Sequence, residues 1–186
     1  MAPYAIRLVG DPVLRQRAHE IDNVDAKLVT LANDMVTTMY DAPGVGLAAP
    51  QVGVQKRLFV YDLGEGEGPK TIVNPVIAET RGEFVYEEGC LSIPDLYFEI
   101  IRPDEVHLTG YDLDGNEISI ETSGFVGRVF QHELDHLDGV LMLDLLDEDR
   151  RKEAQGILRD RQLRATMSNI GTATEEPRRL QLPGRS

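Results

Sequence analysis

The chain has 186 residues, 41% of them hydrophobic, and a formal net charge of −13 at pH 7. This length suits one domain with its own core, and the excess of acidic residues argues against a general nucleic-acid-binding protein. No apolar run approaches the ~18–20 residues that a membrane span needs, and the first residues lack the long apolar region of a signal peptide. Because Cys90 is the single cysteine, no internal disulfide can form, and the sequence predicts a cytoplasmic protein without membrane association.

Helical patterns open the chain. Asp11 and Pro12 resemble an N-cap followed by proline at the first helical position, which predicts a short turn. Between residues 25 and 40, apolar side chains recur at every third or fourth position, with polar side chains between them. This spacing predicts an amphipathic helix that lies on the hydrophobic core, and its apolar stripe is interpreted as packing.

The next segment, residues 41–51, reads as a loop rich in glycine and proline. Gly44 and Gly46 let the backbone approach another group closely or adopt a positive φ. Gln51 supplies an amide that both donates and accepts hydrogen bonds. The segment lacks the lysine and the serine or threonine of a phosphate-binding loop, so no nucleotide cofactor is predicted.

From residue 57 to residue 121 the pattern changes to short β-rich segments with turn-length connections and no helices between them. This arrangement predicts antiparallel pairing, and Asp114-Gly115 reads as a tight hairpin turn. The expected strands are 58–61, 71–74, 83–87, 97–101, 106–111 and 117–121.

The segment 124–139 combines an apolar helical pattern with the motif His132-Glu133-Leu134-Asp135-His136. Residues four apart lie on one face of a helix, so the two histidines can bind one metal ion, and Glu133 can move protons to and from a metal-bound water. The alternative is that both histidines are hydrogen-bonded core residues. A buried helix with three such polar groups needs a partner for each of them, because an unpaired group costs roughly 1–3 kcal/mol.

Positive charge gathers at the C-terminal end. Residues 1–149 contain 10 lysines and arginines against 28 acidic residues, whereas residues 150–186 contain 9 against 4. A helix is expected over residues 148–167, and this basic element could dock on the RNA of the ribosome or on an acidic partner. The alternative is a solvated helix face. Composition predicts a disordered tail over residues 169–186, which leaves residues 1–168 as a single domain.

Two histidines leave a metal site incomplete, because catalytic sites of this kind use three protein ligands and one water. No histidine follows His136, and no pattern favours any of the downstream carboxylates of Asp144, Asp147, Glu148 and Glu153. Upstream, Cys90 offers a thiolate, which is a strong ligand for iron(II), zinc, cobalt or nickel. The alternatives are a buried free cysteine that packs as a small hydrophobe and a cysteine nucleophile that a histidine activates.

Three segments together resemble the motifs of the peptide deformylase family, in that family's order. They are Gly-Val-Gly-Leu-Ala-Ala-Pro-Gln at 44–51, Glu-Gly-Cys-Leu-Ser at 88–92 and Gln-His-Glu-Leu-Asp-His at 131–136. The resemblance covers about residues 4–165 and is to the compact bacterial type without an insertion. It implies an α+β fold, with antiparallel β-sheets around a central metal-binding helix, an N-terminal amphipathic helix and a C-terminal helix.

The resemblance also implies a hydrolase that removes the formyl group from the N-formyl-methionine end of new polypeptides and releases formate. One divalent metal ion would be bound; the family favours iron(II), and zinc, nickel or cobalt are compatible with the same donors. The implied metal ligands are Cys90, His132 and His136. Glu133 would be the general acid/base, and Gln51 and the backbone N–H of Leu91 would bind the formyl oxygen.

The substrate-binding residues that we expect are Gly44, Val45, Gly46, Gly89, Val126 and Val129. The valines would line an apolar pocket for the methionine side chain; for Val126 and Val129, ordinary core packing is the alternative. Glu88 is expected to pair with Arg102, as similar residues do in the family. The segment after Pro94 lacks the arginine that many relatives carry near the cleft, so contacts beyond the methionine are not implied.

Two other functions compete with this interpretation. A zinc endopeptidase with the same helix would take its third ligand from a downstream carboxylate and would not need Cys90. A binding module that kept the fold without catalysis would not need Glu133, because a structural metal site has no use for an acid/base group.

Overall fold

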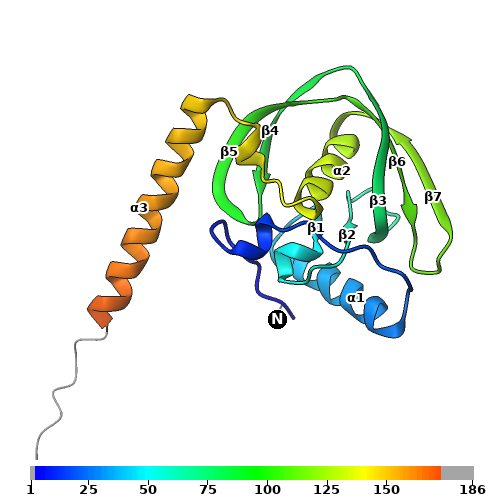
Figure 1. Ribbon diagram of the computed structural model, residues 1–186, viewed down its shortest axis with the longest axis horizontal. Coiled ribbons are helices and arrows are strands. Elements are labelled where there is room, and N and C mark those ends of the chain that lie inside the picture. Colours follow the sequence, from blue (N-terminus) through cyan, green and yellow to red (C-terminus); the bar gives the residue numbers. More distant parts are fainter. Residues whose placement is uncertain (1–2, 173–186) are drawn as a thin grey trace, which may run out of the picture. The chain divides into compact units, whose positions relative to one another are not determined.

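The computed structural model describes residues 3–172 (Figure 1). The chain divides into two compact units, Met1–Leu146 and Asp147–Ser186. The first unit is α+β, as the sequence predicted. Its helices are α1 (Ala26–Asp41) and α2 (Gly124–Leu137), with short 3-10 turns at Pro12–Arg15, Ala49–Val52 and Met142–Leu145. Its strands are β1 (Gly46–Ala48), β2 (Leu58–Tyr61), β3 (Lys70–Arg81), β4 (Phe84–Cys90), β5 (Ile93–Arg102), β6 (Glu105–Tyr111) and β7 (Glu117–Thr122).

The strands form two separate antiparallel sheets. One has five strands in the order β1-β2-β3-β6-β7, and the other consists of β4 and β5 alone. Antiparallel pairing and all six expected strands are confirmed, although β3 and β5 extend well beyond the expected segments. Strand β1 was not predicted, because its residues lie in the glycine-rich loop and pair only through long-range hydrogen bonds with β2.

Helix α1 confirms the amphipathic pattern. Its N-cap is Asp25, whose carboxylate accepts a hydrogen bond of 2.8 Å from the backbone N–H of Leu28. The apolar stripe packs on β1 and β2 and forms much of one hydrophobic core. The buried apolar residues of the helix are Leu28, Leu31, Ala32, Met35 and Met39.

Helix α2 lies between the two sheets, which explains why its sequence is apolar on most sides (Figure 1). Its Phe130 ring packs on Phe59 and Tyr61 of the five-stranded sheet, with ring centroids 6.0 and 5.0 Å away. On another face of the helix, Arg128 donates hydrogen bonds to backbone carbonyls of β4 and β5. The helix therefore carries its two histidines into the space between the sheets.

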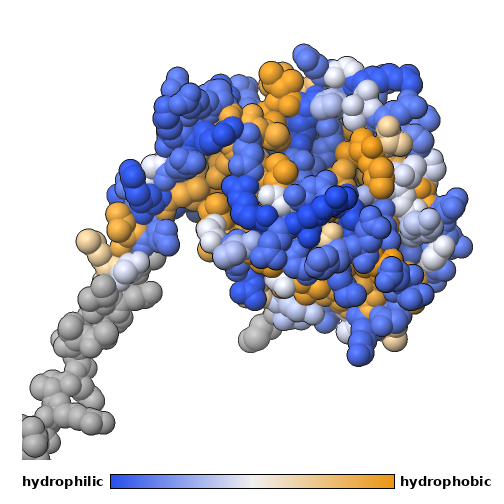
Figure 2. All heavy atoms as spheres, viewed as in Figure 1, coloured by the Kyte–Doolittle hydropathy of each residue, from blue (hydrophilic) through white to orange (hydrophobic). Residues whose placement is uncertain are grey.

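The second unit contains helix α3 (Glu148–Thr172). The helix confirms the predicted start and continues five residues beyond the predicted end at Met167, into the segment for which disorder was expected. Residues 173–186 of that expected tail lie outside the described residues. No helix within residues 3–172 is both long and apolar enough to cross a membrane. On the face seen in Figure 2, hydrophilic residues cover most of the surface and hydrophobic residues show between them.

Candidate active site

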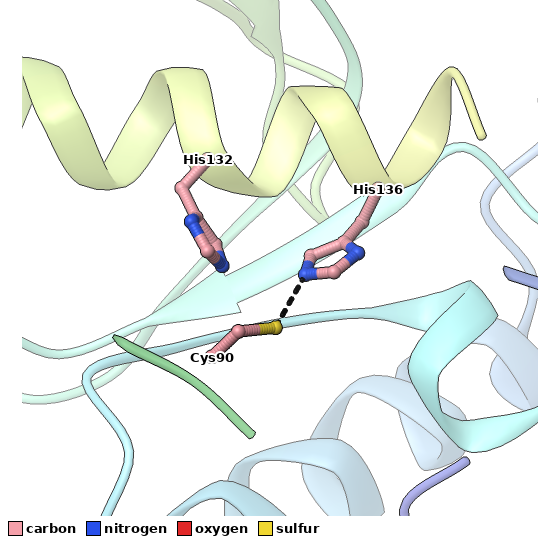
Figure 3. A group of neighbouring side chains, drawn as sticks. All are labelled: Cys90, His132 and His136. Atoms are coloured by element: carbon pink, nitrogen blue, oxygen red, sulfur yellow. Dashed lines mark hydrogen bonds between the residues drawn. The ribbon is translucent and has the colours of Figure 1, made fainter. Parts of the chain in front are cut away.

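Three candidate metal ligands meet between the sheets (Figure 3). Cys90 ends strand β4, and His132 and His136 follow one another by one turn on helix α2. The Cys90 Sγ lies 3.2 Å from His136 Nε2, and one ligand atom from each residue lies within 4.8 Å of the other two. The structure thus brings the upstream thiol to the helical pair, as the sequence analysis expected.

The electrostatics of these three residues favour a negative sulfur. Burial by itself raises the pKa of the Cys90 thiol, but the charge of His136 and hydrogen bonds from both histidines hold this pKa well below its usual value of 9.0. Burial lowers the pKa of His132, yet its bonds to Cys90 and Glu88 raise that pKa well above 6.5. A thiolate and two imidazoles form a donor set that suits zinc or iron(II), and a bound cation would replace the protons that this cluster attracts.

Glu133 lies beside the three ligands with 4% of its surface exposed. Its Oε2 has no hydrogen-bond partner among the described residues, and burial raises the pKa of the carboxyl group to about 7. A carboxyl group with a pKa near neutrality can both accept and return a proton. Gly46 makes room for it, since a Cβ at this position would lie 2.9 Å from the Glu133 Cδ.

The Gln51 side chain is held with its amide nitrogen toward the sulfur. Its Oε1 accepts a hydrogen bond of 2.8 Å from the backbone N–H of Ala48. Its Nε2 donates to Ser92 Oγ at 3.2 Å and lies 3.9 Å from Cys90 Sγ. Because Oε1 is engaged by Ala48 and one N–H by Ser92, the other N–H of the amide faces Cys90 and the candidate metal site.

A cleft of about 490 Å³ opens onto this centre, a volume typical of small-ligand sites. Nearly all of the expected site residues line it: Gly44, Val45, Gly46, Gln51, Gly89, Cys90, Leu91, Val129, His132 and Glu133. His136 lies deeper, with 1% exposed. The cleft wall also includes three aromatic residues that sequence reasoning missed, Tyr86, Tyr97 and Phe125.

Val126 is the exception among the expected pocket residues. It lines a separate hollow with Tyr61 and Phe130 and does not border the cleft. The reason is helical geometry: Val126 shares a face with Phe130, four residues on, and that face packs on the five-stranded sheet. Val129 lies on the face that turns toward the cleft.

A buried ionic network supports the strand that carries Cys90. The Glu88 Oε1 accepts from Arg102 Nε at 2.6 Å and also from Arg128 Nη1. Its Oε2 accepts from Arg102 Nη2 at 3.0 Å and lies 3.1 Å from His132 Nδ1. Burial raises the pKa of Glu88, but the bonds from His132 and Arg102 outweigh it and lower this pKa to about 2.

The expected pairing of Glu88 with Arg102 is confirmed, whereas Arg128 was missed. The one signal in the sequence is a charged residue at a position where the helical pattern is otherwise apolar, between Gly127 and Val129. A buried arginine at such a position requires an anionic partner, but the pattern does not say which carboxylate supplies it.

Known proteins resemble this chain over most of its length. The sequence profile of the family described as polypeptide deformylase matches residues 3–152. The peptide deformylase of Halothermothrix orenii is 50% identical over 139 residues, which cover 75% of this chain and 90% of that protein. Peptide deformylase 1 of Corynebacterium efficiens is 51% identical over 158 residues, 83% of this chain and 93% of that protein.

Solved structures show the same likeness in three dimensions. The crystal structure of a peptide deformylase from Legionella pneumophila superimposes with a TM-score of 0.81 and 40% sequence identity. The match covers 87% of this chain and 97% of the Legionella protein. Since the profile spans most of the sequence and the relatives match along nearly their whole length, the chain belongs to the polypeptide deformylase family of enzymes.

Proposed function

We propose that this chain is a metal-dependent hydrolase that removes the formyl group from the N-formyl-methionine end of new polypeptides and releases formate. The observation that carries the proposal is the meeting of the Cys90 sulfur, two imidazoles and a buried Glu133 carboxyl group at the floor of one cleft. The Oε2 of that carboxyl group has no hydrogen-bond partner among the described residues. Membership of the polypeptide deformylase family supports the choice of substrate.

Cys90, His132 and His136 would hold one divalent cation. When bound, the cation supplies Lewis acidity and a water that is nucleophilic near neutral pH. The donor set accepts iron(II), zinc, nickel or cobalt, and the family resemblance favours iron(II). Purification without oxygen, followed by metal analysis, identifies the native ion. If iron(II) is native, we expect activity to fall in air, with the Cys90 thiolate as the site of oxidation.

Glu133 moves the proton. Its carboxylate takes a proton from the attacking water and returns it to the amine that departs from the formyl group. A pKa near 7 suits both steps, because neither the protonated nor the ionised form is strongly favoured at cellular pH. Its place beside Gly46 directs the carboxyl group toward the cleft floor.

Gln51 and Leu91 stabilise the negative charge that develops on the formyl oxygen. The Gln51 amide is held in place by Ala48 and Ser92, so its N–H groups need no reorganisation during the reaction. Leu91 directly follows Cys90 and borders the cleft, which allows its backbone N–H to act as a second donor. Removal of one such donor typically costs ~10²–10³ in kcat.

The remaining cleft residues receive the methionine and its backbone. Gly44, Gly46 and Gly89 keep side-chain bulk out of the cleft, and a Cβ at Gly89 would lie 2.6 Å from the Tyr97 ring. Val45 and Val129 supply apolar wall for the methionine side chain, together with the Phe125 ring. Tyr97 lies three residues after Pro94 and borders the cleft, so the wall is aromatic at this position.

The deciding experiment measures formate release from a formyl-methionyl peptide, with the acetyl-methionyl peptide as the matched control. We expect release from the first peptide only. The Cys90→Ser variant should lose tight metal binding, whereas an endopeptidase that uses a downstream carboxylate would keep its metal. Cleavage of internal peptide bonds without formate release would reject the proposed function.

Docking of helix α3 on the ribosome remains a separate proposal. Its exposed basic residues include Lys152, Arg159 and Arg164, on a chain that is otherwise strongly acidic. Co-sedimentation of ribosomes with the full chain and with a chain truncated after residue 149 tests the proposal. Equal binding by the two chains would remove it.

A further inference from the structure

We propose that Arg128 is a positioning residue of the candidate metal centre: it sets the Glu88 carboxylate that orients His132, and it joins helix α2 to strand β4. This inference rests on the proposed metal site. It concerns a residue that neither the motif pattern nor the expected pairing of Glu88 with Arg102 includes.

Arg128 is buried, with 2% exposed, and lies one helical turn before His132. Its guanidinium group donates to the carboxylate of Glu88 and to the backbone carbonyls of Phe84 and Ile100, the latter at 3.1 Å. The same group lies over the Phe84 and Tyr86 rings, 5.1 and 5.8 Å from their centroids. One side chain of α2 therefore contacts both strands of the two-stranded sheet.

Such a link matters because the three candidate ligands come from separate pieces of the fold. Cys90 belongs to the two-stranded sheet, which shares no ladder hydrogen bonds with the five-stranded sheet. The histidines belong to α2, whose backbone bonds are satisfied within the helix. Hydrogen bonds between backbones therefore do not fix the distance from the Cys90 sulfur to the two imidazoles. Side-chain bonds between α2 and the two-stranded sheet have to fix it.

Two arginines make these bonds from opposite sides. Arg102 of β5 reaches across to α2 and binds Asp135 at 2.8 Å. Arg128 of α2 reaches across to β4 and β5. Both end on Glu88, and the group of Glu88, Asp135 and the two arginines balances in formal charge, which lowers the cost of burying it.

The geometry at Glu88 shows what Arg128 contributes. A carboxylate has about four acceptor positions, and here each oxygen has two partners. Without Arg128, Oε1 keeps a single donor. The Arg102 fork still holds both oxygens, but no arginine of α2 holds them, so the carboxylate plane can turn together with Arg102 relative to the helix. The Oε2 bond to His132 Nδ1 turns with it, and that bond determines which way the other imidazole nitrogen faces.

The test uses the full chain loaded with Zn²⁺ and follows transfer of zinc to a chromophoric chelator. We expect Arg128→Met, which keeps the length of the stem and removes the charge, to weaken zinc affinity about 10- to 100-fold, the usual effect of losing an outer partner of a metal ligand. Arg128→Lys keeps the charge without the fork of donors and should show a smaller loss. Circular dichroism confirms that each variant is folded, and the lysine variant answers the question if the methionine variant does not fold.

Arg57→Met is the matched control. Arg57 is also buried, with 5% exposed, and it also reaches α2, since it bonds Asp138, the C-cap residue of the helix, at 2.7 Å. Its other bond, of 3.2 Å, goes to the Pro75 carbonyl of β3. Its loss should lower the melting temperature and leave zinc affinity at the wild-type value. Equal loss of zinc affinity in the Arg57 and Arg128 variants would show a general effect of helix loosening and would overturn the inference.

A double-mutant cycle with Glu88→Gln tests whether Arg128 affects zinc binding through Glu88. If Arg128 acts through Glu88, the effect of Arg128→Met on zinc affinity should shrink strongly in the Glu88→Gln background. An undiminished effect, or zinc release from Arg128→Met at the wild-type rate, would overturn the inference. Failure of the wild-type chain to bind zinc or to release formate would instead reject the proposed function itself.

Discussion

Two buried glutamates beside the candidate metal site, Glu88 of β4 and Glu133 of α2, differ in their electrostatic state. Glu88 faces the helix from β4 with 6% exposed, and Glu133 lies on the helix with 4% exposed. Burial raises the pKa of both carboxyl groups, yet the pKa of Glu88 ends at about 2 and that of Glu133 at about 7. The exposed fractions are nearly equal, whereas the hydrogen-bond partners of the two carboxyl groups differ.

The partners also separate the roles of these residues. Both Glu88 oxygens accept from arginine, and one also meets His132, so the carboxylate stays ionised and holds its neighbours. The Oε2 of Glu133 has no partner among the described residues, and the charges of the nearby histidines offset only part of its desolvation. A satisfied carboxylate supports structure, and an unsatisfied one remains available for proton transfer.

The largest expected effect comes from replacing Glu133, the carboxyl group that is available for proton transfer. Glu133→Gln keeps the shape of the side chain and eliminates its proton transfer, so kcat for formate release should fall by about 10²- to 10⁴-fold. Metal content, measured in the same preparations, should remain at the wild-type level. Unchanged turnover would show that Glu133 is not the acid/base group.

Replacing Glu88, the carboxylate that holds its neighbours, should lower the free energy of unfolding. Glu88→Ala leaves two buried arginines without their shared carboxylate, which should cost about 3–5 kcal/mol of unfolding free energy in urea titrations. Glu87→Ala is the control, since Glu87 is the exposed neighbour on the same strand and should change stability by less than about 0.5 kcal/mol. Similar values for the two variants would contradict the role assigned to Glu88.

The pH dependence of stability should have opposite signs for the two groups. The folded pKa of Glu88 is depressed, so its stabilisation is present above pH 4.5 and is lost as the pH falls toward 2. The folded pKa of Glu133 is raised, so its protonated form favours folding and its penalty grows as the pH rises from 4.5 to about 7.

Glu133→Gln should therefore stabilise the metal-free protein by up to about 3 kcal/mol at pH 8, and by little at about pH 4. Urea unfolding of wild type and variant at both pH values measures the difference. A gain of the same size at the two pH values would mean that the effect does not come from titration of Glu133.

A smaller effect should follow from displacing the Glu133 carboxyl group through a steric contact alone. Gly46→Ala puts a Cβ 2.9 Å from the Glu133 Cδ, so the carboxyl group must move, and a displacement of this kind can cost about 10²-fold in kcat. Gly156→Ala is the control, because a Cβ there meets nothing within 4 Å. Full activity of the Gly46 variant would show that the position of Glu133 tolerates the shift.

Much of the fold follows from patterns that are local in the sequence. The three- and four-residue spacing of α1, the Asp11-Pro12 start of the first turn and the short β-rich segments all correspond to elements of the structure. Strand β1 escaped prediction because three residues of a glycine-rich loop become a strand only when β2 lies beside them. For Val126 the sequence left a pocket role and core packing open, because the pattern shows that a helix face is apolar without showing which sheet covers it.

By itself the sequence determined that His132 and His136 share one face of a helix with Glu133 beside them, because the geometry of a helix depends only on neighbouring residues. Only the tertiary structure decided that Arg128 joins Arg102 on Glu88 and that the Oε2 of Glu133 finds no partner within residues 3–172. The physical reason is that a pKa and an ionic bond depend on which charges lie within a few ångströms. Those charges come from β4, β5 and α2, which are distant in sequence and adjacent only after folding.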